Sequence, residues 1–269
     1  MAARLISAAV GIAVLFAVVL SGSMKVLTIA ILICALLGMY ELFHAFGFIK
    51  RPLMVVGGVI ITAVLVLEAY IPEKFILCAC FVYVLLLAVQ LLAAHKEFKF
   101  SQMATAVFCA IYIPLSLMTI LKVRAEEYGF WLMWIALGGA WVTDSFAYFS
   151  GRLFGKHKLF PRISPAKSWE GSIGGGIFVL IAAGIIGYIA NDGEAHRLSI
   201  LGWEGLGLVV VFFGTWGDLV ESLFKRTLGV KDSGNILPGH GGMLDRFDSM
   251  VWTAALLELL ASWVPAIVK

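Results

Sequence analysis

The chain contains nine long apolar runs, and these runs constrain its fold more than any other feature. Each approaches the roughly 20 apolar residues that a helix needs to cross a bilayer. The runs occupy residues 5–22, 25–44, 53–71, 74–94, 103–121, 130–150, 172–190, 205–224 and 249–267. They lack the alternating pattern of outer-membrane β-barrel strands. The sequence therefore predicts an all-α polytopic membrane protein with about nine transmembrane helices.

The distribution of Lys and Arg predicts how these helices are oriented. The 269 residues are 61% hydrophobic and only 14% charged, which excludes an ordinary soluble domain. If the N-terminus is cytosolic, most of the 20 Lys and Arg residues fall in cytosolic loops, as the positive-inside rule requires. Two polar segments, residues 151–170 and 225–248, supply this excess of Lys and Arg on the cytosolic side. Without them the cations are almost equally divided between the two sides. We expect a cytosolic N-terminus, with both polar segments on the cytosolic side.

A polar island between Ser222 and Asp248 interrupts the apolar sequence. Ionisable groups beside membrane segments are costly and usually mark function. Those of the island are Lys225, Arg226, Lys231, Asp232, His240, Asp245, Arg246 and Asp248. Cations and exposed backbone N–H groups suit phosphate, and clustered carboxylates suit Mg²⁺. A loop that only determined the orientation of the membrane helices would need Lys and Arg. It would need neither the Asp residues nor the glycines at 241 and 242.

A second polar constellation lies upstream of the island. Asp144 is near the end of the sixth apolar run and shares a helical face with Tyr148. Ser164, Lys167 and Ser168 follow in a polar segment where the serines can cap a helix or donate to phosphate. The glycines at 174–176 would allow close approach either of a ligand or of another helix. For Asp144, a hydrogen bond between helices is the alternative to a functional role.

Four carboxylates fall near the ends of three predicted helices. Asp218 and Ser222 are four residues apart, and Asp245 and Asp248 are three apart, so each pair shares a helical face. Together with Asp144 these carboxylates would repel one another if they converged. A divalent cation relieves such repulsion most directly. The pattern therefore points to phosphoryl or nucleotidyl transfer with a metal ion.

The segment from Ser222 to Asp248 resembles the signature of the phosphatidate cytidylyltransferase family, also called CDP-diacylglycerol synthases. Residues 144–155, residues 164–171 and the pair Gly217-Asp218 resemble that family as well. The resemblance implies an enzyme of phospholipid biosynthesis that joins CTP and phosphatidate to give CDP-diacylglycerol and pyrophosphate. It implies Mg²⁺ as the cofactor, with a monovalent cation such as K⁺ as an optional second ion.

The resemblance also implies roles for individual residues. The expected metal ligands are Asp144, Asp218, Asp245 and Asp248, of which Asp218 and Asp245 are the main pair. The expected catalytic residues are Asp218, Asp245, Lys225, Arg226 and Lys167. The expected substrate and phosphate contacts are Ser164, Lys167, Ser222, Lys225, Arg226, Lys231, His240, Gly241, Gly242 and Arg246. A purely structural role is the alternative for His240.

The N-terminal third of the sequence shows no comparable polar motif, and the chain is short, without a transit segment or cytosolic extension; these features predict an organisation and a location. We expect residues 1–125 to form N-terminal scaffold helices and residues 126–269 the catalytic region. The expected partners are the lipid bilayer and a second copy of the chain, without nucleic acid. The expected location is a bacterial inner membrane, with the active site facing the cytosol.

Two other functions are compatible with parts of the pattern. A CTP-using lipid kinase, or a cytidylyltransferase for another lipid phosphate, would share the chemistry of metal and phosphate. A secondary transporter would also carry intramembrane carboxylates and glycine-rich breaks. Transporter sites, however, lie near the bilayer midplane between repeats, whereas these charges gather at the helix ends and no repeat is visible.

Overall fold

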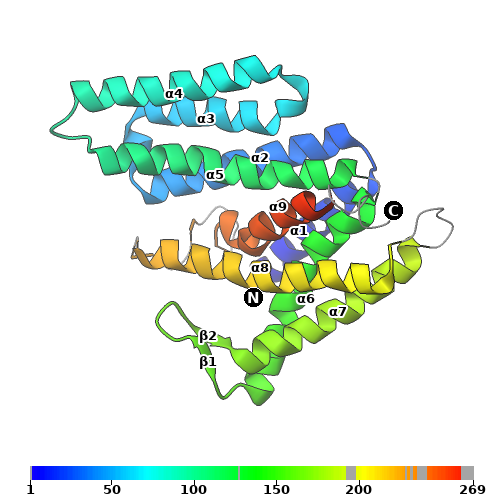
Figure 1. Cartoon of the computed structure of the whole chain (residues 1–269). Coiled ribbons are helices and arrows are strands. Elements are labelled where there is room, and N and C mark those ends of the chain that lie inside the picture. Colours follow the sequence, from blue (N-terminus) through cyan, green and yellow to red (C-terminus); the bar gives the residue numbers. More distant parts are fainter. Residues whose placement is uncertain are drawn as a thin grey trace. The chain divides into compact units, whose positions relative to one another are not determined.

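The chain folds almost entirely into helices in this computed structural model, which describes residues 2–126, 128–191, 198–227, 229–230, 233–234 and 241–261 (Figure 1). The α-helices in these ranges are α1 (Ala2–Leu20), α2 (Met24–Ala45), α3 (Pro52–Val66), α4 (Glu73–Ala93), α5 (Phe100–Ala125), α6 (Gly129–Phe154), α7 (Trp169–Ala190), α8 (Ile200–Thr227) and α9 (Asp248–Ala261). The short elements are the 3₁₀ turns η1 (Phe48–Lys50), η2 (Glu68–Tyr70) and η3 (Leu244–Arg246) and the strands β1 (Lys158–Phe160) and β2 (Ser164–Ser168). The all-α prediction is confirmed, and the small hairpin is an addition to it.

Five of the described helices are long and apolar enough to cross a membrane. They are α2, α4, α5, α7 and α8. Helix α3 is apolar but has only 15 residues, about 22 Å at 1.5 Å per residue, which is less than the bilayer core of about 30 Å. The prediction of a membrane protein therefore agrees with the helices, whereas nine spans and a cytosolic N-terminus stay predictions.

Contacts divide the chain into two compact units. Unit 1 consists of Met1–Leu121 and Val230–Arg246, and unit 2 consists of Lys122–Gly229 and Phe247–Lys269. The boundary falls within α5, and the polar island is split between the units. The division into a scaffold over residues 1–125 and a catalytic region over 126–269 stays a prediction.

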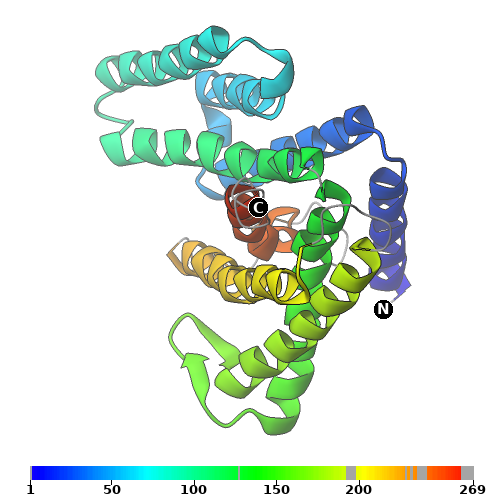
Figure 2. The same ribbon diagram turned by 45° about the vertical axis from the view of Figure 1, so that its right-hand side comes forward.

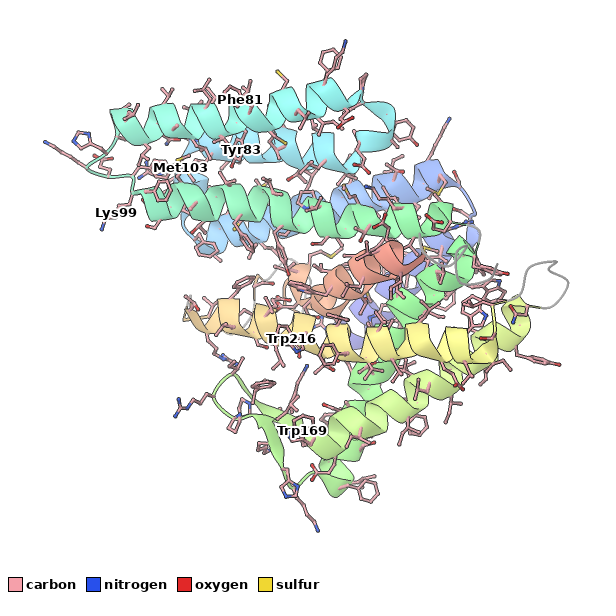
Figure 3. The ribbon with its side chains drawn as sticks, in the orientation of Figure 1. Phe81, Tyr83, Lys99, Met103, Trp169 and Trp216 are labelled. Carbon is pink, nitrogen blue, oxygen red and sulfur yellow. The ribbon has the colours of Figure 1, made fainter. Side chains whose placement is uncertain are left out.

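Helices α2, α3 and α4 of unit 1 pack in sequence order. Their contacts use glycine to bring a large ring against a neighbouring helix. A Cβ at Gly57 of α3 would lie 2.5 Å from the ring of Tyr83 on α4, which Figure 3 labels. A Cβ at Gly58 would lie 2.9 Å from Phe43 on α2. Because such distances exclude a side chain, both glycines are needed for this packing.

Helices α6 and α7 of unit 2 also meet through glycines. A Cβ at Gly175 would lie 2.6 Å from the Thr143 carbonyl oxygen, and one at Gly174 would lie 2.2 Å from the Ser150 hydroxyl oxygen. Small residues allow the backbones of two helices to approach closely. In a membrane this close packing helps hold helices together, because lipid tails are as apolar as the helix surfaces. The glycines at 174 and 175 therefore serve close helix packing, one of the two roles that the sequence left open.

Replacing Gly175 with alanine is expected to destabilise unit 2 by about 1–3 kcal/mol, because the new methyl group overpacks the contact between α6 and α7. The midpoint of thermal unfolding in detergent should fall by several degrees. Gly205 on α8 is the matched control, since a Cβ there meets nothing within 4 Å. Gly205→Ala should melt at or above the wild-type temperature because alanine favours the helix. Equal melting of the two variants would contradict the close contact.

The β-hairpin connects α6 to α7 and projects beyond them (Figure 2). Its strands are antiparallel, with Lys158 opposite Ser168 and Phe160 opposite Ser164. The Trp169 N–H donates to the His157 carbonyl over 3.0 Å and closes the base of the hairpin. The hairpin therefore fixes where the residues of the Ser164–Ser168 motif lie.

Candidate active site

Three carboxylates of unit 2 come together from three different helices. Asp144 lies on α6, Asp218 lies on α8, and Asp248 is the first residue of α9. The Ser249 hydroxyl lies 3.4 Å from the Asp144 carboxylate and 3.2 Å from the Asp248 carboxylate. Each of the three charges acts on the other two. These three residues are called the acidic cluster below.

A glycine brings the helices of the acidic cluster together. A Cβ at Gly217 of α8 would lie 2.6 Å from the Asp248 carbonyl oxygen and 2.7 Å from the Trp252 ring. Only a residue without a side chain permits this approach. The sequence Gly217-Asp218 thus places a carboxylate on the turn of α8 that touches the start of α9.

A lysine from the hairpin reaches the acidic cluster. Lys167 lies on β2, and its ammonium forms an ion pair with the Asp218 carboxylate. The same ammonium donates to the Thr215 carbonyl oxygen over 3.4 Å. Because both partners of the ion pair are about one-fifth exposed, solvent screens the pair only in part. The arrangement brings one cation to Asp218 and into the field of Asp144.

Ser249, which is not among the predicted site residues, contacts two members of the acidic cluster. The Asp248 carboxylate accepts the Ser249 backbone N–H at 2.7 Å and its hydroxyl at 3.2 Å. The hydroxyl also contacts Asp144, so one side chain joins the carboxylates of α6 and α9. No sequence motif marked Ser249, which lies one residue inside α9.

The serines of the hairpin have different positions. Ser168 is the N-cap of α7, and its hydroxyl accepts the Gly171 N–H at 3.2 Å, as the capping prediction required. Ser164 begins β2, at the other end of the strand from Ser168. Glu170 holds the base of the hairpin, since its carboxylate contacts the His157 ring at 2.6 Å and accepts the His157 N–H at 3.2 Å.

The predicted phosphate contacts on α8 lie in its last two turns. Lys225 pairs with the buried Glu221 at 3.5 Å, one helical turn away. Arg226 follows on the exposed side, and Ser222 is half-buried. Cations in the last turn of a helix are favoured by its dipole. The helix therefore presents positive charge beyond the turn that carries Asp218.

The rest of the predicted site lies in the segment of unit 1 that ends with η3. The Asp245 carboxylate accepts the N–H groups of Ser233 at 3.0 Å and Gly242 at 2.9 Å. Gly241 has a φ of 82°, as expected for a glycine that shapes this loop. Arg246 closes η3. Because these residues belong to unit 1, their participation in the acidic cluster stays a prediction.

Two predicted contacts, Lys231 and His240, lie outside the described residues.

The donors of the acidic cluster fit Mg²⁺ in their chemistry, because this ion prefers carboxylate oxygens. Within the described ranges, no three His, Cys, Asp or Glu side chains are arranged so that together they could hold a metal ion. The ion pair with Lys167 takes up the Asp218 carboxylate. Loading a divalent cation would therefore require Lys167 to release Asp218 and the carboxylates to draw together.

Comparison with known proteins connects this chain to one family. The model of the cytidylyltransferase family matches residues 2–264. Proteins named phosphatidate cytidylyltransferase are 46% identical over 143 residues in Haemophilus influenzae, 41% over 167 in Staphylococcus saprophyticus and 40% over 178 in Bacillus subtilis. These matches cover 51%, 62% and 66% of this chain. They cover 49%, 62% and 65% of the three relatives, each less than two thirds of the relative's length. With nearly its whole length matched by the family model, the chain belongs to the cytidylyltransferase family.

Proposed function

We propose that this protein is a phosphatidate cytidylyltransferase, which converts CTP and phosphatidate to CDP-diacylglycerol and pyrophosphate. The observation that carries the proposal is the family match over residues 2–264, together with relatives of 40–46% identity that bear this name. The acidic cluster and Lys167 support it, because the reaction brings two polyanionic substrates together. A site for such a reaction needs both cations and carboxylates that hold metal ions.

The proposed reaction is an in-line displacement. A phosphate oxygen of phosphatidate attacks the α-phosphorus of CTP, a new P–O bond forms, and the bond to the β-phosphate oxygen breaks as pyrophosphate leaves. The attacking monoester is already an anion, so the site scarcely needs a general base. Its main tasks are to orient the two phosphates and to offset their charge.

The cations of the polar island are the proposed phosphate contacts. Around the triphosphate and the lipid phosphate we place Lys225, Arg226, Lys231 and Arg246. Lys167 and Ser164 would hold a phosphate from the hairpin. Further contacts would come from Ser222, His240 and the backbone N–H groups of Gly241 and Gly242, since glycine lets the backbone come close to a phosphate.

The proposed cofactor is Mg²⁺. Asp218 and Asp245 would be its main ligands, with Asp144 and Asp248 as further ligands or as acceptors that orient them. A bound Mg²⁺ would supply charge neutralisation at the phosphates and the leaving group. A monovalent cation such as K⁺ would be an additional ion among the same carboxylates.

The proposed location is a bacterial inner membrane, with the acidic cluster toward the cytosol. The apolar helices and the bacterial relatives support a membrane location. A site on the cytosolic side would give access to CTP, while phosphatidate would enter from the bilayer. A homodimer is part of the same proposal, and the molecular mass of the protein–detergent complex tests it.

Transfer by the purified protein tests the proposal directly. We expect α-labelled CTP, phosphatidate and Mg²⁺ in detergent to give labelled CDP-diacylglycerol and pyrophosphate, and EDTA to abolish the reaction. ATP in place of CTP should give no product. Labelled CDP with phosphorylated lipid would instead indicate a CTP-using lipid kinase. Failure to use any lipid phosphate would overturn the assignment and favour a transporter.

A further inference from the structure

A buried glutamate on an N-terminal helix holds the segment that carries Asp245. Glu41 lies on α2, and only 2% of its surface is exposed. One of its carboxylate oxygens accepts the Met243 N–H at 2.7 Å, and the other accepts the Leu244 N–H at 3.0 Å. Glu41 is about two hundred positions from these residues in sequence. Both partners belong to unit 1, so this contact lies inside one compact unit.

The segment around Glu41 is shaped to accept its carboxylate. A Cβ at Gly234 would lie 2.6 Å from one Glu41 oxygen, and a Cβ at Gly242 would lie 2.8 Å from the other. These distances exclude a side chain at either position without a shift of the neighbouring atoms. The two glycines therefore let the backbone close around the carboxylate of Glu41.

Glu41 and Asp245 divide the N–H groups of this segment between them. Asp245 accepts from Ser233 and Gly242, whereas Glu41 accepts from the next two residues, Met243 and Leu244. Hydrogen bonds to a carboxylate are shorter and stronger than those between neutral groups. The consecutive N–H groups from Gly242 to Leu244 are therefore all bound by two carboxylates, those of Asp245 and Glu41.

We infer that Glu41 is a positioning residue for the active site: its carboxylate holds residues 242–244 so that Asp245 is presented in one orientation. The inference rests on the proposed function, in which Asp245 is a main metal ligand. A glycine-rich segment loses much conformational freedom when it becomes ordered. A clamp that orders it before the substrates bind removes that cost from the reaction. Helix α2 would thus contribute to catalysis without touching the substrates.

Glu41→Gln tests the clamp with almost no change in shape. The glutamine amide would set its NH₂ group, itself a donor, against one of the two backbone N–H donors. We expect kcat to fall about 10–100-fold, the usual loss when a residue that orients a metal ligand is changed. The Mg²⁺ concentration for half-maximal rate should rise, while KM for phosphatidate should stay near the wild-type value. Glu41→Asp, which keeps the carboxylate, should restore part of kcat.

Hydrogen exchange supplies a readout that does not depend on activity. In the ligand-free protein in detergent, the amides of residues 241–246 should exchange faster in Glu41→Gln than in the wild type. Exchange of the hairpin, residues 158–168, should not change. Glu73→Gln is the matched control, because Glu73 is an exposed glutamate at the start of another helix of unit 1. It should match the wild type in both exchange and kcat.

The outcomes separate this inference from the proposed function. Wild-type exchange and wild-type kinetics in Glu41→Gln would overturn the clamp even if the protein transfers CMP to phosphatidate. Faster loop exchange in a protein without transferase activity would support the clamp and overturn the proposed function. If Glu41→Gln does not fold, Gly234→Ala provides a second test, since its methyl group would displace the same carboxylate. It should produce the same faster exchange, and an unchanged loop would count against the clamp.

Discussion

Replacing Asp218 with asparagine is expected to lower the rate of cytidylyl transfer on the order of 10³-fold, the scale seen when one preorganised charge-stabilising group is lost. Asp218 interacts with both other members of the acidic cluster and forms the ion pair with Lys167. Asparagine preserves the shape of the side chain but removes the negative charge that a metal ion requires. The initial rate with labelled CTP in detergent measures the effect.

The same substitution should leave the protein folded. Lys167 and Asp218 are each about one-fifth exposed, so water can solvate the lysine when its partner loses its charge. Glu204→Gln is a matched control on the same helix, because Glu204 is half-buried and lies at the other end of α8. The control should keep wild-type activity. Near wild-type rates in both Asp218→Asn and Asp248→Asn would remove the acidic cluster from the reaction.

The helices could be predicted from the sequence because apolar length alone largely determines them. Each of the nine predicted runs overlaps one described α-helix. The β-hairpin was missed because its strands have only three and five residues. Its sequence, with Pro165 and two serines, shows no apolar alternation that would indicate a strand.

The acidic cluster could be predicted in part. The prediction that Asp245 and Asp248 share one helical face is wrong, because Asp245 lies in η3 and α9 begins only at Asp248. Tertiary packing at Gly217, which helical spacing does not reveal, brings Asp218 to the start of α9. The pairing of Lys167 with Asp218 also depends on the hairpin, which periodicity does not reveal.

Glu41 carried a signal in the sequence that was overlooked. It is the only carboxylate in the 22 residues of α2, and a lone acidic residue within an apolar run is itself an indication of function. Its partners could not be identified from the sequence, because backbone N–H groups about two hundred residues away leave no pattern in the side chains. The expectation that the N-terminal helices only provide a scaffold rested on the absence of a motif, and a single buried side chain does not form one.

Replacing Lys167 with methionine is expected to separate its two proposed roles. As a phosphate contact, Lys167 should contribute to the transition state, so its loss should lower the rate at saturating Mg²⁺ by roughly 10²–10³-fold. As the partner of Asp218, it would compete with the proposed divalent cation for the same carboxylate. Its removal should therefore lower the Mg²⁺ concentration that gives half-maximal rate. Initial rates over a Mg²⁺ titration measure both quantities in one experiment.

A matched control and a conservative variant complete this test of Lys167. Lys158 lies on β1 of the same hairpin and is exposed, so Lys158→Met should change neither the rate nor the Mg²⁺ dependence. Lys167→Arg keeps the charge but replaces a compact ammonium with a planar guanidinium, and it should recover only part of the rate. A purely structural ion pair would give a different result: Lys167→Met would lower the unfolding temperature while the rate per folded molecule and the Mg²⁺ dependence stayed at wild-type values. That result would exclude Lys167 from the chemistry and leave it as a structural partner of Asp218.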